Sequence, residues 1–183
     1  GMRYVDSDYS SSSVFASTAG IEKIRSSSAY LYNHWTPLNS LIWTFGLSYD
    51  NHADPSQGSR VEFSRLNPKL GMLWRARSWL TVRAAHVGTT KHPLVVEDTV
   101  EPAQVSGFAQ FYDDFNRSEA DLNAIALDLR LSDSLRGVVE FRDRDMSVIE
   151  SDESLDEEVY RAEISAFLNA QWTLSLGYQR QKD

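Results

Sequence analysis

Residues 124–142 read AIALDLRLSDSLRGVVEFR, and this stretch decides the fold. On both sides of Ser132-Asp133-Ser134, apolar side chains recur at every second position except at Gly137, and Asp, Arg and Glu occupy positions between them. Successive side chains of a β-strand point to opposite faces of a sheet, so a period of two predicts two antiparallel strands joined by a short turn. Each predicted strand has one apolar face and one polar face.

The same alternation recurs along the chain, and no helical period is sustained. It is found over residues 40–49, 79–88, 160–168 and 172–178. Between 60 and 74 the apolar phase changes near Asn67-Pro68, and because Pro cannot donate to a ladder this change predicts a bulge. Two amino-terminal segments, 4–15 and 21–35, alternate more weakly and are interpreted as strands.

Two classes of connection alternate along the chain. The short turns fall at about 36–39, 75–78, 132–134 and 169–171, and the long polar segments fall at about 50–59, 89–118 and 148–158. Short turns on one rim and long loops on the other are typical of outer-membrane barrels. The sequence therefore predicts an all-β fold: an antiparallel up-and-down β-barrel, or a barrel segment, with about 8–10 long strands.

We expect residues 1–183 to form a single β-barrel domain or a fragment of a larger barrel. Bacterial single-chain barrels have even numbers of strands, whereas about nine are counted here. The chain also ends on the charged run 179–183 rather than on an aromatic residue. Both observations favour a segment of a longer barrel wall.

Composition excludes several classes of protein. The chain has no cysteine, so it can form neither a disulfide framework nor a thiolate metal site. Its net charge of −8 argues against nucleic acid as a partner. No apolar run is long enough for a transmembrane helix. A mean hydropathy of −0.40 is typical of a soluble protein, but a transmembrane barrel would give the same value, because only alternate residues of its strands face lipid.

Four of the five tryptophans lie beside the short turns: Trp35, Trp74, Trp79 and Trp172. An indole has an apolar body and one N–H that prefers to stay hydrated, so such residues form girdles at lipid–water interfaces. We predict that these four lie in one narrow band at the short-turn rim, with Trp43 on the same side but deeper. The other interpretation is a soluble β protein whose tryptophans cap its core.

The polar faces of the strands supply the candidate lumen. By phase alone, the residues expected to line it are Arg83, Arg130, Arg136, Glu140, Arg142, Arg161 and Glu163. A membrane barrel turns its apolar residues to lipid and its charges to a wet lumen, whereas a sandwich or soluble barrel does the reverse. Strands of 11–15 residues with short turns on one rim favour the membrane barrel, since soluble strands average about 5–6 residues.

No catalytic, cofactor or metal site is expected. The four histidines, at positions 34, 52, 86 and 92, form no ligand pair with a nearby carboxylate. The acidic run between Glu150 and Glu158 lacks the ligand spacing of a calcium loop and is interpreted as a solvated loop. Charge pairs two residues apart, such as Arg161 and Glu163, are interpreted as cross-strand ion pairing rather than acid–base chemistry. We therefore expect a protein that is not an enzyme.

Two stretches resemble known families. Residues 66–85, LNPKLGMLWRARSWLTVRAA, resemble a hairpin of TonB-dependent receptor barrels and of the carboxyl-terminal barrels of tetratricopeptide-repeat outer-membrane proteins. Residues 92–114, HPLVVEDTVEPAQVSGFAQFYDD, resemble a long-loop segment of the tetratricopeptide-linked barrels more than that of siderophore receptors. No plug, TonB box or tetratricopeptide helices accompany these stretches. The resemblance implies an outer-membrane barrel wall and carries over no binding residue.

Together these observations predict a Gram-negative outer-membrane β-barrel for passage of a solute or polymer, or for surface recognition, through a polar lumen. The expected partners are the lipid bilayer, a solute or polysaccharide, and periplasmic partner domains. Export or assembly of a polymer is the variant that the tetratricopeptide-linked resemblance implies. The alternative is a soluble antiparallel β-barrel or sandwich that binds a small ligand or a protein partner.

Overall fold

The structure, a computed structural model, describes residues 2–13, 16–54, 61–91, 101–110, 114–115, 117–149, 151, 153–169 and 171–182. Its strands are β1 (Met2–Ser13), β2 (Ala16–Leu38), β3 (Leu41–Asp54), β4 (Val61–Arg77), β5 (Leu80–Lys91), β6 (Gln104–Val105), β7 (Phe108–Ala109), β8 (Ser118–Arg130), β9 (Leu135–Val148), β10 (Ser154–Phe167) and β11 (Thr173–Lys182). The described residues contain no helix long and apolar enough to cross a membrane.

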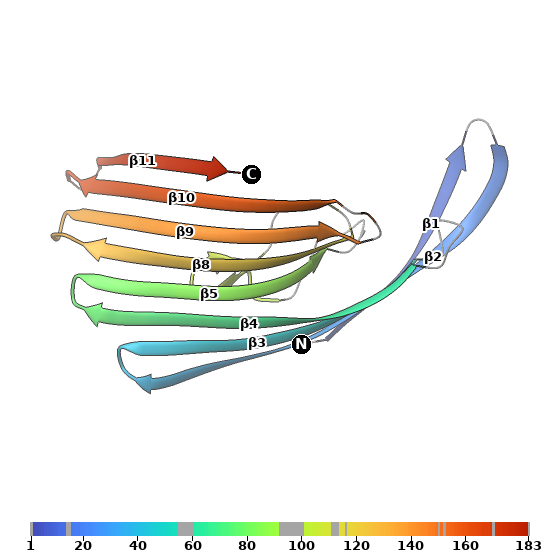
Figure 1. Cartoon of the computed structure of the whole chain (residues 1–183), viewed down its shortest axis with the longest axis horizontal. Helices are drawn as coiled ribbons and strands as arrows, with labels where there is room; N and C mark the ends of the chain where they lie inside the picture. Colours follow the sequence, from blue (N-terminus) through green and yellow to red (C-terminus); the bar gives the residue numbers. More distant parts are fainter. Residues whose placement is uncertain are drawn as a thin grey trace.

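One large sheet makes up most of the molecule (Figure 1). Its nine strands follow the order β1-β2-β3-β4-β5-β8-β9-β10-β11, and every neighbouring pair is antiparallel. In the chain, the small β6–β7 hairpin comes between β5 and β8. In space, it forms a two-stranded sheet of its own. The prediction of an all-β, up-and-down barrel segment is confirmed. The sheet is not closed, since β1 and β11 each pair on one side only.

Short connections gather at one end of the long strands (Figure 1). At this end β2 joins β3, β4 joins β5, β8 joins β9, and β10 joins β11. At the other end, the prediction of a long loop at 148–158 is wrong. The connection is shorter than predicted, because β10 already begins at Ser154. Its charged residues extend the ladder with β9, from Ser154 opposite Ser147 onward. Charged side chains suggested a loop, but an antiparallel ladder is held by backbone hydrogen bonds and accepts them.

The predicted bulge at Asn67-Pro68 is also wrong. The β3–β4 register is continuous through Leu47 opposite Pro68 and on to Asp54 opposite Val61. The apolar phase changes because Phe63 lies on the opposite face from Leu66, where its ring packs 5.3 Å from that of His52. Pro68 marks the limit of the other ladder instead, since the β4–β5 pairing starts at Lys69 opposite Val87. A residue without an N–H is tolerated where a strand leaves its neighbour.

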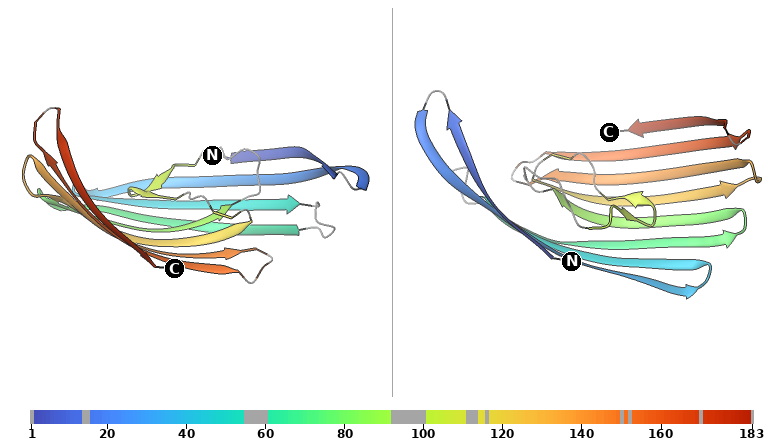
Figure 2. Two further views of the ribbon diagram at one scale, coloured as in Figure 1. Left: turned by 90° about the horizontal axis from the view of Figure 1, so that it is seen from above. Right: turned by 180° about the vertical axis from the view of Figure 1, so that it is seen from behind.

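The two faces of the sheet differ in chemistry. The inner face is the one covered by the β6–β7 hairpin, and the sheet curves around it (Figure 2). Polar and charged inner-face residues are buried there, among them Thr44, Ser48, Asp50, Lys69 and Arg144. The outer face carries exposed large apolar side chains, which include Phe45, Leu47, Leu70, Ile125, Leu127, Val139, Ile164, Leu174 and Leu176. The apolar phase of the sequence therefore corresponds to the exposed face.

Candidate functional site

The candidate site is the inner face together with the β6–β7 hairpin that lies on it. The hairpin is made by Val105 opposite Phe108, with Ser106 and Gly107 between them. Both turn residues have positive φ, 49° at Ser106 and 86° at Gly107. This is the geometry of a two-residue type I′ turn, whose twist matches that of paired strands. Glycine is suited to such a conformation because it has no Cβ to clash.

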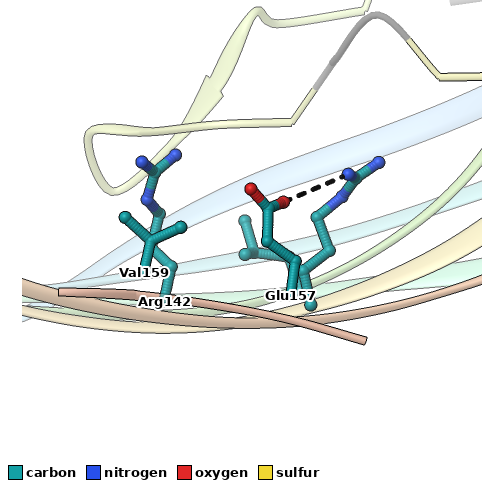
Figure 3. Close-up of a pocket in the computed structure, with 5 residues that line it drawn as sticks. Arg142, Glu157 and Val159 are labelled. Carbon is teal, nitrogen blue, oxygen red and sulfur yellow. Dashed lines mark ion pairs between the residues drawn. The ribbon is translucent and has the colours of Figure 1, made fainter. Parts of the chain in front are cut away.

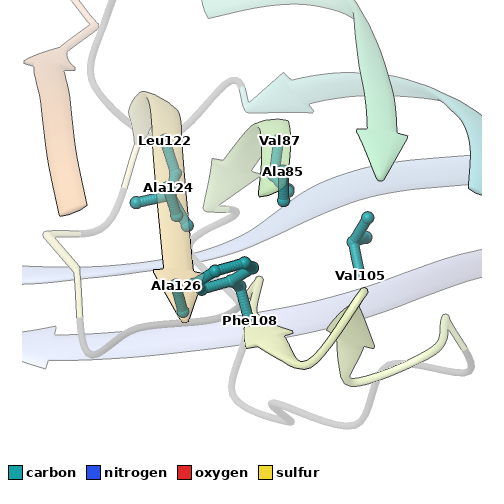
Figure 4. Packing of buried hydrophobic residues seen from close by; sticks show 7 residues of the cluster. All are labelled: Ala85, Val87, Val105, Phe108, Leu122, Ala124 and Ala126. Carbon is teal, nitrogen blue, oxygen red and sulfur yellow. The ribbon is translucent and has the colours of Figure 1, made fainter. Parts of the chain in front are cut away.

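Two apolar side chains hold the hairpin against the sheet. Val105 and Phe108 are 0% and 2% exposed. They pack with residues of β5 and β8, namely Ala85, Val87, Leu122, Ala124 and Ala126 (Figure 4). Three of these five are alanines, and small side chains leave room for a ring on a polar barrel surface. This cluster is the apolar core of the described residues.

A glycine on the sheet makes close docking of the turn possible. A Cβ placed on Gly71 would lie 2.3 Å from Ser106 Oγ and 2.8 Å from Val105 Cγ1. Such contacts are well inside van der Waals distance, so a side chain at position 71 would force Ser106 and Val105 to shift. Gly46 plays the same part for Tyr32, whose ring would lie 2.7 Å from an added Cβ.

Buried polar groups fix the base of the hairpin segment. Lys69 Nζ lies 3.0 Å from a Glu101 carboxylate oxygen and donates to Ser48 Oγ at 2.8 Å. Tyr32 donates its hydroxyl to Glu101 at 2.8 Å, and its oxygen lies 3.1 Å from Gln110 Oε1. The side chains of Lys69 and Glu101 are only 1% and 8% exposed. A charge buried this deeply needs a partner, so the pair ties the segment to the sheet strongly.

A second polar node lies beside this pair, around Asp50. Its carboxylate accepts a hydrogen bond from Ser28 Oγ at 2.6 Å and one from Asn67 Nδ2 at 2.7 Å. Asn67 in turn lies 3.0 Å from Thr90 Oγ1. Asp50 and Asn67 are both buried. Asp50 is on β3, and its two partners are on the neighbouring strands β2 and β4. Such hydrogen bonds compensate for the burial of the carboxylate on the inner face.

Ion pairs continue along the inner face below the hairpin. Arg83 donates to both oxygens of Asp128, at 2.7 and 3.0 Å, which is a bidentate contact. The Arg83 guanidinium also lies 4.9 Å from the centre of the Phe108 ring, a cation–π distance. Glu140 lies 4.0 Å from Arg83 and 3.2 Å from Arg142. Arg83 therefore connects the charged strip to the hairpin.

Arg144 forms a further link to the long β5–β8 connection. It pairs with Asp114 from that connection and lies 3.6 Å from Glu157 on β10. The ion pair with Glu157 is the dashed line in Figure 3. In that view the labelled side chains of Arg142, Glu157 and Val159 stand on the hairpin side of the sheet. They line a hollow with Leu122 and Arg144.

All seven predicted lumen residues lie on this inner face by register. Arg83 and Glu140 lie opposite the core residue Ala126 in the β5–β8 and β8–β9 ladders, and Arg161 lies opposite Glu140. The structure brings Arg83, Glu140 and Arg142 together. Arg161 and Glu163 form a separate pair at 2.6 Å, and Arg130 and Arg136 lie apart from both groups, next to the short β8–β9 turn. That these residues line a lumen stays a prediction.

The tryptophans lie exposed near the short turns. The exposed fractions are 55% for Trp35, 44% for Trp74, 51% for Trp79 and 66% for Trp172. Their arrangement in one narrow interfacial band stays a prediction. Trp43 is directly opposite Trp35 in the β2–β3 ladder, and it lies two positions farther from the short turns than Trp74, which is opposite Leu41. The expectation that Trp43 lies deeper therefore holds relative to Trp74 and is wrong relative to Trp35. An irregularity between Trp35 and Leu38 adds one residue to the β2 side of the turn and so brings the two indoles level.

Several residues of the site were not anticipated from the sequence. The sequence predicts residues 89–118 as one long loop and so does not indicate the hairpin. The roles of Tyr32, Lys69 and Gly71 do not follow from the sequence either, because their partners lie in this segment. The Ser-Gly pair between Val105 and Phe108 was the available signal, since such pairs form two-residue hairpin turns. Outside this site, Tyr49, Tyr160 and Tyr178 are exposed on the outer face, far from the short turns.

No metal site is evident in the described part of the chain. No group of three or more His, Asp or Glu side chains there could hold a metal ion. His52 is fully buried on the inner face, whereas His86 lies on the outer side with its Nδ1 2.9 Å from Asn123 Oδ1. His92 and the acidic residues Glu150 and Asp152 fall outside the described residues.

Comparison with known proteins finds relatives by fold alone. Neither protein-family profiles nor curated sequences give a match. Among solved structures, the fold resembles a chain in the FpvAI–pyocin S2 complex, with a TM-score of 0.60 and 15% identity over 90% of this chain and 24% of that one. It also resembles the FrpB iron transporter from Neisseria meningitidis (F3-3 variant), with a TM-score of 0.64 and 14% identity over 89% of this chain and 26% of that one.

A third similar structure is the ferric-catecholate import receptor Fiu from E. coli K12, in a closed form. Its TM-score is 0.54, with 15% identity over 94% of this chain and 30% of that one. The chain thus spans between about a quarter and a third of the proteins it resembles. At such identities the likeness shows the fold alone. It supports the resemblance to receptor barrels, and the resemblance to tetratricopeptide-linked barrels stays a prediction.

Proposed function

We propose that this chain forms part of the wall of an outer-membrane β-barrel that takes up or recognises a solute through a polar lumen. One observation carries the proposal: the sheet exposes its large apolar side chains on the outer face and buries charged ones on the inner face. A soluble protein would gain free energy by the opposite arrangement. In a bilayer the outer face would contact lipid, and the inner face would meet water.

The limits of the apolar surface support a membrane position. On β10 and the residue after it, the outer apolar positions run from Leu168 to Tyr160 and then change to Glu158 and Asp156. On β3 they run from Leu41 to Tyr49. These spans approach the roughly 9–11 tilted residues that a transmembrane strand requires. The tyrosines at the far end and the tryptophans at the short-turn end would supply the two aromatic girdles of such a barrel.

The inner face supports passage or recognition rather than catalysis. Several of its charges are arranged in ion pairs, such as Arg83 with Asp128 and Arg142 with Glu140. The hairpin covers part of this polar surface. Two of the proteins that share the fold are described as an iron transporter and an import receptor, which favours uptake. Residues 1–183 would then be one segment of a larger barrel. Polymer export with periplasmic partner domains is the variant implied by the tetratricopeptide-linked resemblance.

Brominated lipids test this proposal. They quench indole fluorescence only where the indole contacts the bilayer, and four of the tryptophans are exposed. The folded chain in vesicles should show strong quenching of its tryptophan fluorescence by brominated lipid. On a gel, its band should migrate differently in an unheated sample and in a boiled one. Variants that keep only Trp79 or only Trp172 should be quenched best by bromine near the headgroups.

The soluble alternative predicts the reverse set of results. A soluble sandwich would remain in the supernatant after high-speed centrifugation without detergent. Its tryptophans would be quenched by aqueous acrylamide and not by brominated lipid. That outcome would overturn the membrane proposal, including the girdle formed by Trp35, Trp74, Trp79 and Trp172.

A further inference from the structure

We propose that the short-turn end of the inner face carries a subsite for an oxyanion, centred on Arg130 and Arg136. The inference rests on the proposed function, which makes this end a mouth of the lumen. It goes further by naming the class of solute: one that carries a carboxylate or phosphate group.

The first observation is an unfavourable pairing between strands. Arg130 on β8 and Arg136 on β9 are directly opposite in register and share the inner face. Like charges placed directly across a ladder repel each other and destabilise it. The same row continues through Ser165 on β10 and Ser175 on β11, whose hydroxyl oxygens lie 2.7 Å apart. The row thus has two cations and no carboxylate.

The second observation is that the protein barely neutralises these two charges. Arg130 lies 2.7 Å from Asp133, but the side chains are 58% and 98% exposed, so solvent screens this ion pair. Arg136 is exposed and lies over the ring of Phe167, with its guanidinium 5.4 Å from the ring centre. Among the described residues, the structure gives Arg136 no carboxylate partner.

The arginines farther along the inner face are different. Arg83 has Asp128 at 2.7 Å, Arg142 has Glu140 at 3.2 Å, and Arg161 has Glu163 at 2.6 Å. The chain as a whole has a net charge of −8, so its composition does not account for an excess of positive charge at one end of the inner face. Binding of an anion would relieve the repulsion between Arg130 and Arg136.

Arginine chemistry indicates the class of ligand. The planar guanidinium presents paired N–H donors that match the oxygens of a carboxylate or phosphate. Two such groups on neighbouring strands lie about 5 Å apart at the backbone, which suits one oxyanion held between them or two linked oxyanions. The stacking of Arg136 on Phe167 restricts its movement and leaves its donors available.

Titration calorimetry on the full chain in lipid nanodiscs tests the subsite. Pyrophosphate and trigalacturonate serve as phosphate and carboxylate probes, at low salt because charge interactions are screened within about 10 Å at 0.1 M ionic strength. The wild-type chain should bind at least one probe. Arg130→Gln and Arg136→Gln should each weaken binding about tenfold, the effect of losing one charge-assisted hydrogen bond.

Arg180→Gln is the matched control, because Arg180 is exposed on β11 opposite Tyr160 of the outer face. It should bind as the wild type does. The subsite is overturned if neither probe binds, or if Arg180→Gln weakens binding as much as the other two variants. The heat-modifiable band of the same samples reports membrane insertion independently. A chain that inserts without binding refutes the subsite alone, and a chain that does not insert refutes the proposed function.

Discussion

Gly71 on β4 lies directly beneath Ser106 in the turn of the β6–β7 hairpin, so close that an added Cβ would lie 2.3 Å from the Ser106 hydroxyl oxygen. The sheet and a segment about 35 residues later in the chain are therefore fitted to each other at a single position without a side chain. The contact means that the hairpin is a docked part of the inner face. Its position can be tested through the residues that hold it.

Gly71→Val should displace the hairpin from the sheet. The added side chain overlaps Ser106 and Val105, and overpacking of this kind costs about 1–3 kcal/mol. Hydrogen exchange at residues 104–109 should become faster, while exchange in the β8–β9 ladder stays slow. The control is Gly137→Val, because a Cβ at Gly137 meets nothing closer than 3.6 Å. Unchanged exchange in Gly71→Val would show that the hairpin is not docked there.

Phe108→Ala should destabilise the inner face by about 3–5 kcal/mol, the usual cost of removing a buried ring. Phe108 is 2% exposed and packs against the inner-face residues of β5 and β8. Phe115 is a matched control in the same connection, since it is 64% exposed. Its replacement by Ala should change the free energy of unfolding by less than about 0.5 kcal/mol. Equal effects in urea titrations of the two variants would show that Phe108 is not packed against the sheet.

Lys69→Met should destabilise the protein by about 3–5 kcal/mol, because it leaves the buried Glu101 carboxylate without its cation. Replacing both residues, as Lys69→Met with Glu101→Gln, should recover much of this loss. Lys182→Met is the control, since the Lys182–Glu158 pair is 3.7 Å long and the Lys182 side chain is 64% exposed. This surface pair should contribute only about 0–1 kcal/mol. A double variant no more stable than the single one would show that the pair is not coupled.

Leu176→Arg should impair insertion into lipid vesicles. Leu176 is 72% exposed on the outer face, and a charge at the bilayer midplane costs about 2–4 kcal/mol. Gln179→Arg places the same side chain on the inner face of the same strand and should insert normally. Folding yields in vesicles, measured from the unheated gel band, give the comparison. Equal yields would place Leu176 outside the bilayer.

Much of the fold can be predicted from the sequence, because it depends on the alternation of apolar and polar side chains along each strand. Alternation at Ile125, Leu127 and Leu129 fixes a strand and its two faces, and short polar turns fix which strands are neighbours. The same parity placed all seven predicted lumen residues on one face. Errors arose where local signals conflicted: the charges after Ser154 suggested a loop, and Pro68 suggested a bulge.

Other features were decided by tertiary structure alone. Which face is buried cannot be read from alternation, since both faces have the same period. The hairpin settled it by docking on the polar side, through Gly71, Phe108 and the Lys69–Glu101 pair. Lys69 and Gly71 precede their hairpin partners Glu101 and Ser106 by more than 30 positions, and they meet them only when the sheet is assembled. The sequence by itself determined strands, turns and parity, because these follow from the backbone and its nearest neighbours. Only the folded sheet decided which charges pair and where the hairpin lies, because such contacts depend on register between distant strands.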